Sequence, residues 1–169
     1  MVVRMSRLSL NTDSAMIIIF TGGEMLKPPY NSIYLQEIAE TQGALFERLQ
    51  DVAPTVDGLD FIRSYMKSET RAFIDKGDVY LATLGPKGLM DYYLTEDVCA
   101  TKAGSPLRGF VPNWIGQFYA QYQWHTGTLS SDIVDHIPPE WLVSAYPGLH
   151  DLDIRLAVEK VASEIGNDK

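Results

Sequence analysis

Cysteine is almost absent from this sequence, because the 169 residues contain only one, Cys99. A single cysteine excludes an intramolecular disulfide, which fits a reducing compartment, and we therefore expect a cytoplasmic protein. A chain of this length buries roughly 70% of the surface that its unfolded form exposes. One domain of this size needs no covalent cross-link to be stable.

Basic residues are scarce relative to acidic ones. The chain has 14 lysines and arginines against 22 aspartates and glutamates, which gives a formal net charge of −8. An acidic surface repels the phosphate backbone of nucleic acids and attracts basic proteins. We therefore expect no nucleic-acid binding by the chain alone, and a basic protein as the favoured kind of partner.

Long apolar runs are also missing. No run approaches the roughly 20 residues of a membrane-spanning helix. Residues 16–20 are apolar, but the polar residues 11–14 separate them from Arg4 and Arg7, so a signal peptide is not indicated. We expect no membrane insertion. Residues 1–31 are expected to form an N-terminal arm or a short β-hairpin.

Sequence signatures of common enzyme and cofactor sites are missing too. The chain has no Gly-x-Gly-x-x-Gly, no P-loop Gly-Lys-Ser/Thr and no Gly-x-Ser-x-Gly nucleophile elbow. Cys99 follows Glu96 and Asp97, whose charges oppose the formation of a reactive thiolate. We therefore expect no cofactor, and we favour a protein that is not an enzyme.

From Ser32 onward the apolar residues follow helical spacing. We expect residues 32–169 to form one mostly α-helical domain of several short helices. Gly43 leaves open whether the first segment is one helix or two. A further helix is expected between the cap Asp57 and the terminating Gly77. Near the C-terminus we expect Pro147-Gly148 to turn the chain and Asp151 to cap the last helix.

The sequence WIGQFYAQYQWHTG, residues 114–127, concentrates aromatic side chains. On a helical wheel with 100° per residue, Trp114, Phe118, Tyr122 and His125 share one face. A stripe at this spacing is typical of a helix in the core. The domain is therefore expected to be built around an aromatic core helix.

Three other residues of this helix lie away from the stripe. Gly116 and Ala120 lie on the opposite side, where small residues would let another backbone approach closely. Trp124 either belongs to a second layer of the core or is exposed and anchors a partner, because tryptophan is enriched at interface hot spots. Trp124 is thus the candidate partner-binding residue.

Two other classes of function stay open. The first is a small metal-dependent hydrolase, whose catalytic candidates are His125, His136, His150, Asp132, Asp135 and Asp153. No pair of these histidines has the His-x-x-x-His spacing that puts two ligands on one helical face, so we expect no metal site. The second is a small-ligand pocket lined by Trp114, Tyr119 and Tyr122.

Two segments together resemble a known group of proteins. They are FIRSYMKSETRAFIDKGDVYLA, residues 61–82, and WIGQFYAQYQWHTG with the following SSDIVDHIPPEWLVSAYPGLHDLDIRLAVEKV, residues 130–161. They resemble small helical bacterial proteins of unknown function found among mobile-element and toxin–antitoxin-like genes. The resemblance implies an antitoxin-like or accessory role and assigns no functional residue.

The sequence thus favours a non-enzymatic protein-binding module. The acidic surface, the missing catalytic signatures, the N-terminal arm and the off-stripe Trp124 support this hypothesis. The arm would add a strand to a partner or exchange between two copies, which leaves a homodimer open.

Overall fold

Two long helices cross at the centre of the computed structural model, which describes residues 28–97 and 101–167. They are α2 (Leu35–Val52) and α7 (Val111–Thr126). The other described elements are η1 (Ser32–Tyr34), α3 (Gly58–Met66), α4 (Glu69–Asp75), α5 (Val79–Ala82), α6 (Gly85–Glu96), α8 (Ser130–His136), α9 (Pro139–Leu149) and α10 (Ile154–Asn167). The fold is therefore mostly α-helical and a single domain, as predicted. The expected β-hairpin or arm of residues 1–31 and Cys99 lie, apart from residues 28–31, outside the described residues.

Two glycines let α2 and α7 approach closely. A Cβ atom on Gly116 would lie 2.6 Å from the Cα of Gly43, and one on Gly43 would lie 2.7 Å from the carbonyl oxygen of Asn113. Both distances are too short for real side chains. Gly43 therefore serves helix packing within one continuous helix α2, and the close approach expected at Gly116 is confirmed.

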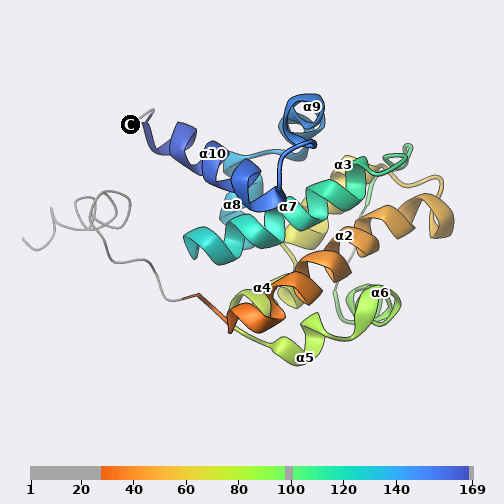
Figure 1. The fold of residues 1–169 in the computed structure, drawn as a ribbon. Coiled ribbons are helices and arrows are strands. Elements are labelled where there is room, and N and C mark those ends of the chain that lie inside the picture. The colour runs from red at the N-terminus through yellow and green to blue at the C-terminus, as the bar shows by residue number, and fades with distance from the viewer. Residues whose placement is uncertain (1–27, 98–100, 168–169) are drawn as a thin grey trace, which may run out of the picture.

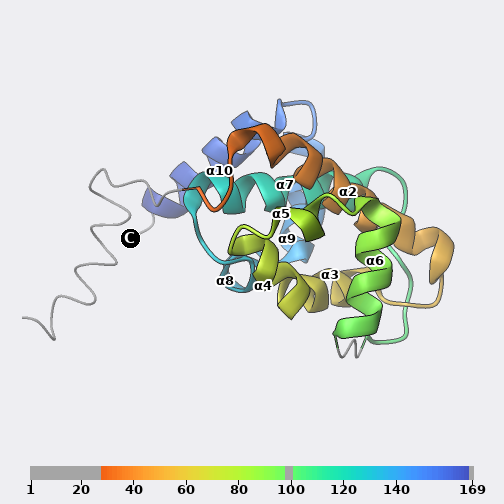
Figure 2. The ribbon, with the colours of Figure 1, turned by 90° about the horizontal axis from the view of Figure 1, so that it is seen from below.

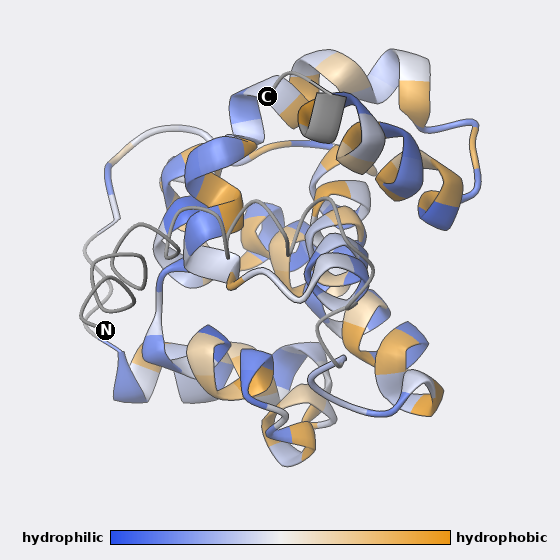
Figure 3. Ribbon diagram, turned by 90° about the vertical axis from the view of Figure 1, so that its left-hand side faces the viewer, coloured by the Kyte–Doolittle hydropathy of each residue, from blue (hydrophilic) through white to orange (hydrophobic). Residues whose placement is uncertain are grey.

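The remaining helices cover the crossed pair on two sides (Figure 1). Helices α9 and α10 lie on the α7 side, whereas α4, α5 and α6 lie on the α2 side. Figure 2 shows α3, α4, α5 and α6 together in the view from below. Hydrophilic and hydrophobic residues are interspersed along the helical ribbons (Figure 3). No helix in the described part of the chain is long and apolar enough to cross a membrane.

The helix expected between Asp57 and Gly77 is in fact two helices. Asp57 caps α3 as predicted, because its Oδ1 accepts from the backbone N–H of Asp60 at 2.8 Å. The chain then breaks at Ser68, whose hydroxyl donates to the carbonyl of Tyr65 and accepts from the backbone N–H of Arg71. The Phe73 ring on α4 is exposed after this break.

Two predictions near the C-terminus are wrong. Pro147 does not turn the chain but lies inside α9, near its end. The last helix begins at Ile154, and Asp153 rather than Asp151 caps it, with Asp153 Oδ1 accepting from the Arg155 N–H at 2.9 Å. In both cases packing moved an element boundary by a few residues, which sequence signals do not resolve.

The core is rich in aromatic rings, which meet edge to face around Tyr65 and at small interplanar angles along α7. Tyr65 contacts Phe46 and Tyr93 with ring centroids 5.5 and 5.3 Å apart. On α7, Phe118 lies 5.4 Å from Trp114 and 5.9 Å from Tyr122 between ring centroids. These rings are buried, so the prediction of a domain built around an aromatic core helix is confirmed.

Candidate functional site

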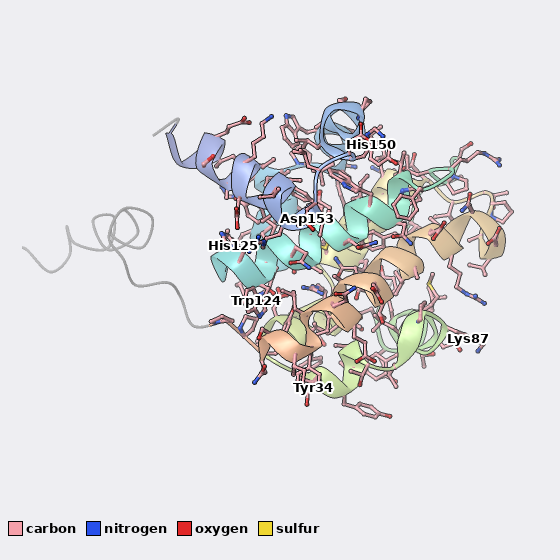
Figure 4. The ribbon with its side chains drawn as sticks, in the orientation of Figure 1. Tyr34, Lys87, Trp124, His125, His150 and Asp153 are labelled. Atoms are coloured by element: carbon pink, nitrogen blue, oxygen red, sulfur yellow. The ribbon has the colours of Figure 1, made fainter. Side chains whose placement is uncertain are left out.

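The histidines and aspartates proposed for catalysis do not form one cluster, because Asp132, Asp135 and His136 share α8 whereas the other three lie on or beside other helices. Within the part of the chain that the structure describes, no three His, Cys, Asp or Glu side chains are grouped so that they could hold a metal ion. Figure 4 shows His125 near the C-terminal end of α7 and His150 well apart from it, with Asp153 between them. His125 is exposed, because the helix face that buries Trp114 runs past the edge of the core at its last turn.

Each of the three aspartates has a local structural partner. Asp135 pairs with Lys67 at 2.6 Å, which ties α8 to α3. Asp153 caps α10, as described above. Asp132 lies in the first turn of α8, and its carboxylate accepts from the Ser131 hydroxyl at 3.4 Å. These contacts are typical of helix capping and ion pairing between helices.

His150 is held by the end of α9. Its ring stacks on Tyr146 with centroids 4.6 Å apart, and its Nδ1 lies 3.0 Å from the Tyr146 carbonyl oxygen. Its Nε2 lies 3.3 Å from Oδ1 of Asp151. The imidazole therefore closes the helix C-terminus, where side chains commonly bond the last carbonyl groups.

The aromatic residues proposed for a ligand pocket lie in the core instead of around a cavity. Trp114, Tyr119 and Tyr122 are all buried. The Tyr119 hydroxyl donates to the Ile137 carbonyl at 2.6 Å, and burial raises the pKa of this phenol far above its usual range. Tyr119 thereby joins α7 to the residue that follows α8.

Trp124, the proposed partner-binding residue, is half-buried (Figure 4). Its indole Nε1 donates to the carbonyl of Tyr30 at 3.1 Å. The Tyr30 ring is itself buried in the core, although Tyr30 precedes the boundary expected at residue 32. Trp124 therefore fastens residues 28–31 to α7, and its role in binding a partner stays a prediction.

A groove between α8, α9 and α10 has an apolar floor and is lined by the exposed ring of Trp141. We call it the α8–α10 groove, and it has a volume of about 280 Å³. The residues that line it are His136, Ile137, Trp141, Val161, Glu164 and Ile165. Ile137 and Val161 are buried, whereas the Trp141 residue is 42% exposed. Sequence analysis singled out His136 alone among these residues as a candidate.

The polar groups of the α8–α10 groove are hydrogen-bond acceptors. Nδ1 of His136 lies 2.7 Å from the Asp132 carbonyl oxygen, so in the neutral imidazole Nδ1 carries the proton and Nε2 is an acceptor. Glu164 is exposed and forms no ion pair within the described residues. A ligand of this groove must therefore supply donors.

A buried polar cluster fixes the start of α8. The backbone N–H and the hydroxyl of Ser130 donate to the two carboxylate oxygens of Asp75 at 2.7 and 2.8 Å. Nε of Arg71 donates to the Ser130 hydroxyl oxygen at 2.8 Å. Tyr119 holds the carbonyl of Ile137 just past the end of α8. Both ends of α8, which forms one wall of the α8–α10 groove, are thus anchored in the core.

Arg71 is the centre of this polar cluster and is fully buried. It lies 3.1 Å from Asp75 Oδ1 and donates through Nη1 to Gln42 Oε1 at 2.7 Å. Gln42 in turn donates to the Gly116 carbonyl at 2.9 Å. Burial lowers the pKa of Arg71, but Asp75 and neighbouring phenols raise it more, so the guanidinium stays charged. Sequence analysis missed this cluster, because an Arg and an Asp four residues apart resemble a surface ion pair.

A second hollow, between α3, α4 and α6, is polar. It has a volume of about 580 Å³ and includes Lys67, Glu69, Glu96 and Asp97. The Asp97 carboxylate accepts from the backbone N–H groups of Glu69 and Thr70 at 2.9 and 3.1 Å, so it caps α4. Tyr93 is the one aromatic residue of its lining, and helix capping explains the position of its central acid.

Comparison of the chain with models of known protein families, with curated proteins and with solved structures finds no match.

Proposed function

We propose that this chain is a non-enzymatic protein-binding module that acts in the cytoplasm and binds a basic partner through the α8–α10 groove. An antitoxin-like or mobile-element accessory role is the specific form of this proposal, and a homodimer is compatible with it. The proposal follows the acidic net charge of −8 and the resemblance of residues 61–82 and 114–161 to small helical bacterial proteins of unknown function found among mobile-element and toxin–antitoxin-like genes.

The observation that carries the proposal is Trp141 at the edge of an apolar hollow. Tryptophan is enriched at interface hot spots, where a few aromatic side chains in well-packed pockets provide most of the binding energy. The volume of about 280 Å³ lies just below the roughly 300–1,000 Å³ typical of small-molecule sites. The groove suits one large apolar side chain of a partner better than a whole cofactor.

The position of the groove on the fold supports the same function. Its floor residues Ile137 and Val161 are buried in the core, and α8 is anchored at both ends. A surface held in place before binding loses little conformational entropy when a partner docks. No specific observation favours the hydrolase or the ligand-pocket alternative, since their candidate residues lie apart or in the core.

The test is affinity purification from the cells that make the protein, with two matched alanine variants. Trp141→Ala removes the aromatic wall of the groove. Phe73→Ala removes an aromatic ring on α4 that is equally exposed, at 42%. We expect a partner that the wild type and Phe73→Ala recover and Trp141→Ala loses, with all three proteins equally folded by circular dichroism. Equal recovery of every partner by Trp141→Ala would overturn the proposal.

A further inference from the structure

We infer that the α8–α10 groove selects a partner segment that presents one large apolar side chain together with an arginine or a lysine beside it. This inference rests on the proposed function and specifies the chemistry of its partner. It follows from the floor of the groove, from its acceptor groups and from the charges around it.

The floor requires an apolar anchor. Ile137, Val161 and Ile165 provide aliphatic surface, and Trp141 closes one side with an indole ring. Burying a large aliphatic or aromatic side chain there is favourable, whereas a polar side chain without a hydrogen-bond partner is disfavoured. The anchor is therefore a residue such as leucine, isoleucine, methionine or phenylalanine.

The polar edge requires a hydrogen-bond donor with positive charge. Glu164 offers a carboxylate, and the neutral imidazole of His136 offers the lone pair of Nε2 when its Nδ1 donates to the Asp132 carbonyl. Neither an acidic nor a purely acceptor side chain could be satisfied beside these two groups. A guanidinium or an ammonium group could pair with Glu164.

The basic residues of α3 do not neutralise the carboxylate of Glu164. Lys67 pairs with Asp135, and Arg63 pairs with Glu140, so these basic residues of α3 are engaged by acids of α8 and α9. Lys160 lies one turn before Glu164 on α10, does not line the groove and forms no ion pair with Glu164. The carboxylate of Glu164 is thus available to a cation from outside.

Trp141 favours arginine over lysine at the basic position. The planar guanidinium stacks on indole rings and is more weakly hydrated than an ammonium group. Cation–π contacts at exposed sites contribute about 0.5–1 kcal/mol, which corresponds to roughly twofold to fivefold in affinity. We therefore expect arginine-bearing segments to bind more tightly than their lysine counterparts.

The experiment selects peptides from a phage-displayed library of random 12-residue sequences on the purified full-length protein. We expect enriched sequences to share a large apolar residue with an arginine or a lysine near it. The enrichment should vanish on Trp141→Ala. Enrichment of no peptide, or of peptides that bind Trp141→Ala equally well, would overturn both this inference and the use of the groove.

Synthetic versions of one enriched peptide then separate the charge preference from binding itself. Fluorescence anisotropy would compare the basic residue with glutamine and glutamate, on the wild type and on Glu164→Lys. We expect Glu164→Lys to lower the affinity for the basic peptide about threefold to tenfold and to raise the affinity for the glutamate peptide. Asp51→Lys, the same charge change at an exposed site on α2, should leave both affinities unchanged.

The outcomes distinguish the two proposals. If the three peptides bind the wild type equally well and Trp141→Ala abolishes the binding of all three, the groove binds proteins but the proposed charge preference is wrong. If Asp51→Lys weakens the basic peptide as much as Glu164→Lys does, the preference reflects only the net charge of −8, and the assignment to Glu164 is overturned.

Discussion

At the scale of single residues, Arg71 shows how a charge is accommodated inside this core. Its guanidinium contacts Asp75 on α4, Ser130 on α8 and Gln42 on α2. A buried ion pair contributes little net stability, but removing one member leaves a charge without compensation. The cluster therefore fixes how α2, α4 and α8 are arranged more than it adds to stability.

Asp75→Ala should lower the free energy of unfolding by about 3–5 kcal/mol, because it leaves Arg71 buried without its carboxylate. The double variant Arg71→Met with Asp75→Leu should lose much less, since neither charge remains. Guanidinium denaturation of the two variants and the wild type measures both effects. A loss below about 1 kcal/mol for Asp75→Ala would show that water reaches this site.

Trp124→Phe should cost about 0.5–1.5 kcal/mol of stability, since it removes the hydrogen bond from Nε1 to the Tyr30 carbonyl and keeps most of the ring packing. Because Trp124 does not line the α8–α10 groove, peptide binding should be unchanged. Thermal unfolding and fluorescence anisotropy measure the two quantities. Loss of a partner with unchanged stability would instead identify Trp124 as the anchor predicted from the sequence.

At the scale of the elements, the sequence predicts helices well where apolar spacing and caps agree. The aromatic stripe of residues 114–126 predicted α7, and Asp57 predicted the start of α3. The predictions fail where tertiary contacts decide, as at Ser68, where side-chain bonds to Tyr65 and Arg71 end one helix and start another. Pro147 lies in the last turn of α9, close to the helix end that its sequence signal predicts.

Gly116→Ala should destabilise the crossing of α2 and α7 by about 1–3 kcal/mol, because the new Cβ would lie 2.6 Å from the Gly43 backbone. Gly148→Ala is the matched control, since a Cβ there meets nothing within 4 Å. Alanine favours helix over glycine by up to about 1 kcal/mol, so the control should be neutral or stabilising. Chemical denaturation of both variants measures the difference, and equal effects would contradict the close packing described.

At the scale of the whole molecule, buried phenols make the stability depend on pH. Burial raises the pKa of Tyr65 to about 12 from the usual value of about 10. The folded state therefore holds the phenol proton more tightly than the unfolded state does. The stabilisation of the folded state that comes from this raised pKa is fully present below pH 10. It is lost as the pH rises from 10 towards 12, by about 1.4 kcal/mol per pH unit.

Tyr65→Phe should accordingly reduce the loss of stability between pH 10 and pH 12. Urea denaturation at several pH values in this range would show a smaller slope for the variant than for the wild type. The same slope in both proteins would contradict the assignment to Tyr65, and the loss would then belong to other buried phenols such as Tyr119, whose pKa burial also raises.

The candidate site was much harder to predict from the sequence than the fold. His136 was selected for metal chemistry, whereas the structure places it beside Trp141 and Glu164. Trp141 lies in an apolar helical pattern that is equally typical of a core residue, and Glu164 resembles any other acid of a solvated helix face. Only the packing of α8, α9 and α10 brings the three together, and helical spacing does not specify that packing.

The most direct test of the central claim is site-specific photo-crosslinking in the cells that make the protein. A photoreactive phenylalanine would replace Trp141 in one variant and Phe73, which is equally exposed, in the other. We predict that position 141 crosslinks to one basic partner protein and that position 73 does not. Crosslinking of the same proteins from both positions, or from position 73 alone, would contradict the assignment of the α8–α10 groove as the binding surface.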